Sequence, residues 1–172
     1  GVESHVIGGQ LIGGDAGGMA AASQARRRQP YMEIVALERG TRTSYSACGI
    51  PYVIGGAVPG GLEALIVRDP EEHRRRGVDA RIDHDVVAVD PDAREVRFVD
   101  RRRGEDGRLE YDQLLLATGG APIRPDLPGI DLPFIQGVQT LGDAQRLLGL
   151  AEQGLPRAVI VGGGYIGLEM AE

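Results

Sequence analysis

Apolar runs and glycine turns alternate in the first part of the chain. The run ending at Leu11-Ile12 is followed by a glycine-rich stretch and then by the alanine-rich segment Met19–Arg28, whose three final arginines suit the negative end of a helix dipole. Pro30 is expected to end this helix, and Glu33–Glu38 is a second short apolar run. The order strand, glycine turn, helix, strand predicts an open parallel α/β sheet.

The middle of the chain changes to segments in which apolar and polar positions alternate. Before them, Asp69–Arg76 predicts a helix, because Asp69 is a capping residue and a proline follows it at the first helical position. Segments 85–90 and 95–100 then alternate with a period of two, and a further turn is expected at Gly104–Gly107. This pattern predicts a small antiparallel β-meander.

The last third of the chain repeats the opening pattern. Residues 114–120 predict an apolar strand that ends in small residues, and the proline-rich stretch 122–133 predicts a connection. A domain boundary is expected near Pro156. Residues 157–172 then predict a strand over Ala158–Val161, a glycine turn and a helix, so a second domain of the same kind is expected to begin there.

Composition narrows the possible functions. With 172 residues and 42% hydrophobic content the chain can bury one ordinary core. A net charge of -6 argues against nucleic-acid binding. All 19 basic residues are arginine, which excludes a Walker-type phosphate loop and a lysine Schiff base in this stretch. One cysteine and no apolar run of about 18 residues predict neither an intrachain disulfide nor a membrane span, and a reducing cytoplasm is expected.

Two glycine clusters match a dinucleotide fingerprint. Gly162–Gly167 satisfies G-x-G-x-x-G after an apolar run, whereas Gly13–Gly18 carries Asp15 in place of the middle glycine. Glu38 lies 20 residues after Gly18 and could accept hydrogen bonds from a ribose. Plain turns in an α/β sheet are the structural alternative, but two such clusters favour two bound dinucleotides.

The lone cysteine allows two interpretations. Pro51, just after Cys48, suggests that a helix begins there with its positive end near the sulfur, which favours a thiolate. Free cysteine is also among the most buried residue types, so Cys48 could be a small core residue. The histidines His5, His73 and His84 have no second ligand at metal spacing, and surface or capping roles are expected for them.

The order of these motifs resembles the pyridine nucleotide-disulfide oxidoreductases, over roughly residues 10 to 172. Members of the glutathione-reductase type have a second cysteine shortly after the first, but Tyr52 stands there, which excludes a dithiol mechanism in this chain. Residues 44–56 are similar to the single-cysteine branch, closest to coenzyme A disulfide reductases, with NADH oxidases and peroxidases as cousins. Some members carry Asn where Ala47 stands, so the substrate stays open.

The resemblance implies a Rossmann-like, three-layer α/β FAD-binding fold with a small antiparallel β-meander, followed by the truncated start of a second Rossmann-like domain. The corresponding domains are residues 10–155, the N-terminal part of an FAD-binding domain, and residues 156–172, the start of an NAD(P)-binding domain. In the family a C-terminal region completes the FAD domain and forms a homodimer interface. We therefore expect these residues alone to be inactive.

The resemblance also assigns residues to ligands. The residues expected to contact FAD are Gly13, Gly14, Asp15, Ala16, Gly18, Glu38, Arg39, Val86, Thr118 and Gly119. Those expected to contact NAD(P)H are Gly162, Gly164, Tyr165, Ile166, Gly167 and Glu169. The catalytic residue is expected to be Cys48, and the residues expected to contact a coenzyme A substrate are Gln24, Arg27 and Ser44. No metal site is expected.

Three functions follow from these assignments. The first is an NAD(P)H:disulfide oxidoreductase that passes electrons through FAD to a mixed disulfide of Cys48 with coenzyme A, or to a related small disulfide or persulfide. The second is an NADH oxidase or peroxidase in which Cys48 cycles through a sulfenic acid. The third is a non-catalytic dinucleotide-binding electron carrier or sensor in which Cys48 is buried.

Overall fold

The computed structural model describes residues 7–154 and 157–172. It divides into two compact units. The first comprises the chain up to Tyr45 together with Arg68–Gly119, and the second comprises Ser46–Val67 together with Gly120–Glu172. The predicted domain boundary near residue 156 lies outside the described residues.

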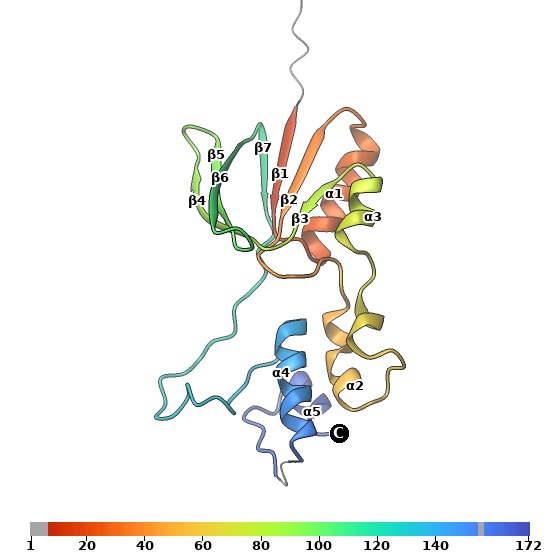
Figure 1. Ribbon diagram of the computed structural model, residues 1–172, viewed down its shortest axis with the longest axis vertical. Helices are drawn as coiled ribbons and strands as arrows, with labels where there is room; N and C mark the ends of the chain where they lie inside the picture. The colour runs from red at the N-terminus through yellow and green to blue at the C-terminus, as the bar shows by residue number, and fades with distance from the viewer. Residues whose placement is uncertain (1–6, 155–156) are drawn as a thin grey trace, which may run out of the picture. The chain divides into compact units, whose positions relative to one another are not determined.

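A parallel sheet forms the centre of the first unit (Figure 1). Its strands, in the order β3-β2-β1-β7, are β3 (Asp79–Arg81), β2 (Glu33–Leu37), β1 (Gly8–Ile12) and β7 (Gln113–Leu116). Every neighbouring pair is parallel, so the carboxyl ends of β1, β2 and β7 meet at one edge. The predicted parallel sheet is confirmed, whereas the three-residue strand β3 escaped prediction because it is too short to show a period.

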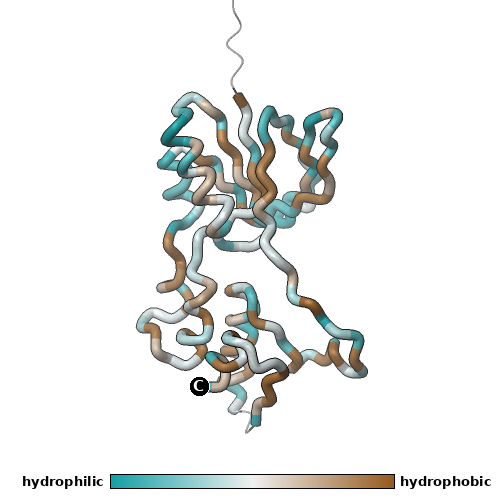
Figure 2. The backbone as a smooth tube through the Cα atoms, turned by 180° about the vertical axis from the view of Figure 1, so that it is seen from behind, coloured by the Kyte–Doolittle hydropathy of each residue, from teal (hydrophilic) through white to brown (hydrophobic). Residues whose placement is uncertain are grey.

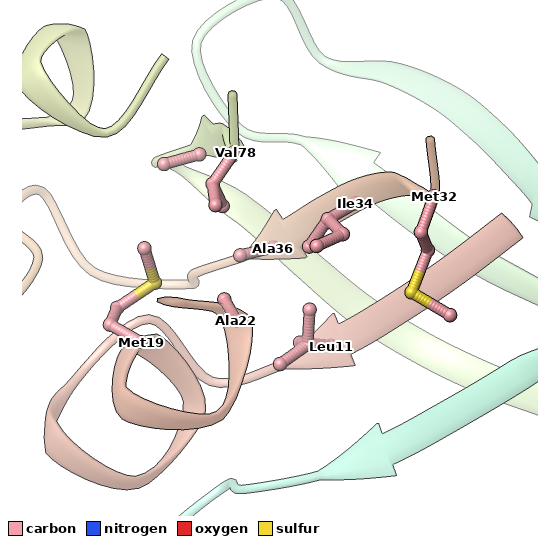
Figure 3. Packing of buried hydrophobic residues seen from close by; sticks show 8 residues of the cluster. Leu11, Met19, Ala22, Met32, Ile34, Ala36 and Val78 are labelled. Carbon is pink, nitrogen blue, oxygen red and sulfur yellow. The ribbon is translucent and has the colours of Figure 1, made fainter. Parts of the chain in front are cut away.

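Helix α1 (Ala16–Arg28) covers one face of this sheet. Its side chains Met19 and Ala22 pack against Leu11 of β1 and Ile34 of β2 (Figure 3). Burying each large apolar side chain contributes roughly 1.5–3 kcal/mol. The predicted helix is confirmed and begins three residues earlier than expected, directly after the first glycine cluster.

A shorter helix, α3 (Pro70–Arg75), precedes β3. The Asp69 side chain accepts a hydrogen bond from the Glu72 backbone N–H, at 2.7 Å, and Gly77 follows the helix with a φ of 82°. This is the predicted capping arrangement, in which a carboxylate satisfies an N–H of the first helical turn.

The opposite face of the parallel sheet is covered by three antiparallel strands, β4 (His84–Asp90), β5 (Glu95–Asp100) and β6 (Glu105–Glu110). Ile12 and Leu37 of the parallel sheet pack against Val96 and Phe98 of β5. Helices, parallel sheet and antiparallel sheet therefore make three layers, which confirms the predicted fold class.

One predicted turn of the meander is wrong. Gly104–Gly107 was expected to be a turn, but the chain turns at residues 101–104 and β6 begins at Glu105. Gly107 lies inside the strand, paired with Phe98, and a glycine fits there because a Cβ would come within 2.4 Å of the Phe98 ring. Residues 101–104, three arginines and a glycine, form a hydrophilic turn before β6 (Figure 2).

The second unit is built from short helices. They are the 3-10 helices η1 (Ala47–Gly49) and η2 (Gly61–Leu65) and the α-helices α2 (Ile50–Ile54), α4 (Leu141–Glu152) and α5 (Tyr165–Glu169). Ile50, Val53, Leu65 and Ala144 form its core.

The strand predicted at Ala158–Val161 is not formed in the structure. Val159 and Val161 are 82% and 92% exposed, and among the described residues none pairs with this segment as a neighbouring strand. An isolated apolar run has no ladder of inter-strand hydrogen bonds to hold it extended. The helix expected after it is present as α5.

Candidate functional site

The first glycine turn lies at the carboxyl edge of the parallel sheet. Gly13 follows β1 directly, has a φ of 111° and donates its N–H to the Leu37 carbonyl at 2.9 Å. A Cβ on Gly13 would lie 2.1 Å from the Ala117 carbonyl oxygen, just past β7. Only glycine fits both the backbone conformation and this close approach.

Gly18 brings the helix close to the turn. A Cβ there would lie 1.9 Å from the Gly13 carbonyl oxygen. Because α1 begins at Ala16, the N–H groups of its first turn have no acceptor inside the helix. Such a side-chain-free turn at a helix N-terminus fits the pyrophosphate of a dinucleotide, and FAD is the group that the sequence predicts here.

Asp15, the departure from the glycine pattern, is the N-cap residue of α1. Its φ of -102° is open to any L-residue, so no glycine is required. Its carboxylate accepts a hydrogen bond from the Tyr45 backbone N–H at 3.2 Å instead of capping the helix. The substitution thus ties the glycine turn to a distant part of the chain.

Glu38, which follows β2, is hydrogen-bonded to the same turn. One carboxylate oxygen accepts the Gly14 N–H at 2.7 Å, and the other accepts the Gly40 N–H at 2.6 Å. A carboxylate oxygen has a second lone pair, so both can still accept from a ribose hydroxyl. The donor set therefore fits the predicted ribose contact. Arg39 is exposed beside it.

The remaining residues expected to contact FAD also lie in the first unit. Val86 is half-buried beside a β-bulge in β4, and its side chain packs into the core between the two sheets. Thr118 and Gly119 are exposed, and Gly119 has a φ of 66°. A backbone contact at Val86 and a close approach at Gly119 stay predictions.

The second glycine turn repeats the geometry of the first. Gly162 has a φ of 117°, and a Cβ on Gly167 would lie 2.0 Å from the Gly162 carbonyl oxygen. Gly164 is the N-cap residue of α5. The other residues expected to contact NAD(P)H, all exposed, are Tyr165, Ile166 and Glu169.

Cys48 is exposed, in the short helix η1 of the second unit. A Cβ on Gly49 would lie 2.4 Å from the Leu65 side chain, so this turn packs tightly on η2. The predicted helix start is confirmed, since α2 begins at Ile50 with Pro51 in its first turn. The alternative that Cys48 is a buried core residue is wrong, because the side chains of its neighbours Ile50 and Val53 fill the core instead.

The segment Thr43–Tyr45 leads into the cysteine turn and is held in the first unit. Ser44 has a left-handed φ of 49°, and its N–H donates to the Gly14 carbonyl at 3.1 Å. Its hydroxyl forms a 2.9 Å hydrogen bond with Nε2 of His73. Thr43 is buried and donates its hydroxyl to the Arg68 carbonyl.

His73 corrects a prediction, because it is neither a surface nor a capping residue. Its side chain is 1% exposed. Burial lowers the pKa of His73 below 6.5, Arg68 and Arg76 lower this pKa further, and Glu72 and Asp69 oppose them. Every other position of α3 after Pro70 carries a full charge, a signal that could have identified His73 as the inward-facing residue.

The two substrate candidates on α1 form a pair. Arg27 donates to the Gln24 side-chain oxygen at 2.6 Å, and both residues are exposed. The guanidinium retains donors suited to a phosphate. Within the described residues, no group of three or more His, Cys, Asp or Glu side chains could hold a metal ion. In the same residues no helix is long and apolar enough to span a bilayer.

A three-layer fold with a glycine turn at the carboxyl edge of its parallel sheet defines a dinucleotide-binding α/β protein. The family model described as pyridine nucleotide-disulphide oxidoreductase matches residues 10–172. The chain belongs to this family.

Similar proteins include an NADH oxidase from Methanocaldococcus jannaschii, 37% identical over 94% of this chain and 36% of the relative. An NAD(P)H sulfur oxidoreductase (CoA-dependent) from Pyrococcus abyssi is also 37% identical, over 94% of this chain and 35% of the relative. The structure of reduced Bacillus anthracis CoADR-RHD matches with a TM-score of 0.90 and 31% identity, over 97% of this chain and 30% of the other. The chain thus spans about a third of the length of these relatives.

Proposed function

We propose that the chain belongs to an FAD-dependent NAD(P)H oxidoreductase that reduces coenzyme A disulfide, or a related small disulfide or persulfide, through the single thiol of Cys48. The observation that carries this proposal is the exposure of Cys48. The segment Thr43–Tyr45, which ends three residues before it in the sequence, is hydrogen-bonded to the first glycine turn. An exposed thiol can meet a disulfide, whereas a buried one is inert.

The chain's own residues would bind and orient the two nucleotides. The first turn of α1 would hold the FAD pyrophosphate and Glu38 its ribose, and Gly162–Gly167 would hold NAD(P)H. FAD, when bound, supplies the transfer of an electron pair from NAD(P)H towards the sulfur. Residues 10–155 and 156–172 are proposed as the corresponding parts of two nucleotide-binding domains.

Cys48 would form and break the bond to the substrate. Its thiolate attacks a disulfide RS–SR, which forms Cys48–S–SR and releases one RS⁻. Two electrons derived from NAD(P)H then break the mixed disulfide to the Cys48 thiolate and a second RS⁻. Two protons, one from NAD(P)H and one from solvent, complete two RSH. No second protein thiol is needed, in agreement with the single cysteine of the chain.

Coenzyme A is the proposed thiol because of the α1 surface. Arg27 presents a guanidinium held by Gln24, and coenzyme A carries phosphates that such a fork can bind. The P. abyssi relative is named for its dependence on CoA, and the similar B. anthracis structure is titled CoADR. A homodimer, as the resemblance implies, is part of this proposal.

A second candidate is an NADH oxidase or peroxidase, favoured by the name of the M. jannaschii relative. Here the Cys48 thiolate would take an oxygen atom from peroxide, and the resulting sulfenic acid would be reduced to thiol and water. The third alternative, a non-catalytic carrier or sensor, assumed a buried cysteine, and the exposure of Cys48 argues against it.

The test is NAD(P)H consumption by the FAD-loaded full-length protein without oxygen, with and without coenzyme A disulfide. Cys48→Ser is the variant, and Ser46→Ala, two residues earlier on the same exposed turn, is the matched control. We expect disulfide-dependent turnover in the unmodified protein and the control, and a loss of at least about a hundredfold in Cys48→Ser, because the nucleophile is removed.

Turnover that returns only when oxygen or peroxide is added would support the oxidase or peroxidase instead. Full activity of Cys48→Ser would overturn both candidates. A purified full-length protein that binds no flavin would overturn the role proposed for the first glycine turn.

A further inference from the structure

A fully buried histidine forms a hydrogen bond with a side chain of the segment that leads into the reactive cysteine. His73 Nε2 lies 2.9 Å from the Ser44 hydroxyl, and the His73 side chain is 1% exposed. None of the roles proposed above uses this imidazole. A buried polar group of this size is costly unless it is hydrogen-bonded, so the contact with Ser44 is a defining interaction of the site.

Ser44 needs such a contact to hold its conformation. Its φ of 49° lies in the left-handed region, which costs a residue other than glycine, asparagine or aspartate of order 1–3 kcal/mol unless the surroundings fix it. The backbone N–H of Ser44 is fixed by the Gly14 carbonyl and its side chain by His73. The two hydrogen bonds act on opposite parts of the same residue.

The neighbours of Ser44 are fixed in the same way. Thr43 bonds to the Arg68 carbonyl just before α3, and Tyr45 donates its N–H to Asp15. Thr43 is therefore attached to the α3 region, Ser44 to both α3 and the first glycine turn, and Tyr45 to the first glycine turn. Tyr45 is thus the last residue of the first unit before the cysteine, which follows it by three residues in the sequence.

We propose that His73 is a positioning residue, which fixes the left-handed turn at Ser44 and thereby the direction of the Ser44 hydroxyl, the expected substrate contact. This inference rests on the proposed function for its catalytic consequence. The positioning itself concerns only residues of the first unit and can be measured without turnover.

The charge state of His73 matters to this role. The neutral imidazole can exchange one hydrogen bond with the hydroxyl in either direction, whereas the imidazolium adds a buried charge. The charged groups facing it are Arg68, Asp69, Glu72 and Arg76, all on or beside α3, and the loop side contributes the uncharged Ser44. The two arginines disfavour the imidazolium, in line with a neutral positioning group.

The first experiment is amide hydrogen exchange of the peptide that contains Ser44 and Tyr45, in the full-length protein. His73→Phe keeps a ring but removes the hydrogen bond, His73→Gln retains a side-chain nitrogen at a similar reach, and His84→Gln is the matched control. His84 bonds to the Ile82 carbonyl and takes no part in the segment. We expect exchange to accelerate about fivefold to tenfold in His73→Phe, and to stay near the unmodified rate in the other two variants.

The second experiment is the steady-state rate with coenzyme A disulfide. We expect kcat/KM to fall about tenfold in His73→Phe and to recover in His73→Gln, because a displaced Ser44 hydroxyl would orient the substrate less well. The unmodified protein should lose activity as the pH falls through the pKa of His73, which burial lowers from 6.5, and His73→Gln, which cannot ionise, should lose this step.

Ser44→Ala removes the same hydrogen bond without altering the core, so it serves if His73→Phe does not fold. Unchanged exchange in both Ser44→Ala and His73→Phe, or a His73→Gln variant no better than His73→Phe, overturns the positioning role. An unmodified protein without Cys48-dependent turnover overturns the proposed function, and the exchange pattern then decides on the positioning alone.

Discussion

The two glycine turns share one local geometry but have very different surroundings. Gly13 and Gly162 have φ values of 111° and 117°. In each turn, a Cβ added to the glycine five residues later would lie within 2.0 Å of the carbonyl oxygen of that first glycine. A Cβ on Gly13 would collide with Ala117, whereas a Cβ on Gly162 would meet nothing within 4 Å among residues 7–154 and 157–172. The glycine spacing therefore predicts the conformation of both turns. At the first turn, the packed parallel sheet adds specific hydrogen-bond donors and acceptors.

The largest expected effect, on the free energy of unfolding, comes from replacing the first glycine of each turn, Gly13 or Gly162, by alanine. Gly13→Ala adds a backbone collision to the strain of a positive φ, and we expect it to lower the free energy of unfolding by about 3 kcal/mol or more. Gly162→Ala carries only the strain, about 1–2 kcal/mol. Urea denaturation of the full-length protein measures both. Equal losses would show that the surroundings contribute nothing.

The next effect concerns charge at the first turn. Glu38→Gln exchanges a carboxylate that holds the Gly14 and Gly40 N–H groups for a neutral amide, which offers one acceptor oxygen instead of two. We expect the affinity for FAD to fall about tenfold, or about 1.4 kcal/mol. Flavin fluorescence titration measures it. Glu169→Gln, at the end of helix α5 after the second glycine turn, is the control, and a similar loss there would contradict the assignment of the first turn to FAD.

A smaller change makes the two turns alike. Asp15→Gly gives the first turn the residue that Gly164 supplies in the second, and removes the acceptor of the Tyr45 N–H. We expect a loss of about 1 kcal/mol in the free energy of unfolding, typical of one hydrogen bond. Amide exchange at Tyr45 should accelerate. Unchanged protection there would mean that the carboxylate does not hold this segment.

The smallest expected effect is a dependence of stability on pH in the first unit. The pKa of His73 is lowered in the folded protein, so between this pKa and 6.5 the unfolded chain binds more protons than the folded one. The free energy of unfolding should therefore decrease as the pH falls through 6.5, and level off below the folded pKa. His73→Gln should remove this decrease, whereas His84→Gln should retain it. Urea midpoints measured at several pH values decide between them.

The sequence predicted the first unit better than the second, for a physical reason. Strands such as Glu95–Asp100 have a period of two that appears in the sequence, and Asp69 with Pro70 marks a helix start by local chemistry. The strand expected at Ala158–Val161 depended on a partner that the described residues do not provide. Helix α4, whose capping box at Thr140 and Asp143 was a usable signal, was not predicted.

The same distinction holds for the candidate site. The glycine turns and the helix start at Pro51 follow from local spacing, and the structure has them where they were expected. The hydrogen bonds of His73 to Ser44 and of Tyr45 to Asp15 join residues about 30 positions apart, which no local pattern reveals. The roles of the individual residues towards their ligands stay predictions.

The exposure of Cys48 has a practical consequence, because the chain contains one thiol and no lysine. A maleimide dye or nitroxide would attach to a single side chain, while amine-directed cross-linkers would find no ε-amine in these residues. The label would occupy the sulfur proposed to react with substrate. A Cys48-labelled chain of these 172 residues would therefore be a spectroscopic probe of the cysteine turn in which the sulfur proposed to react is blocked.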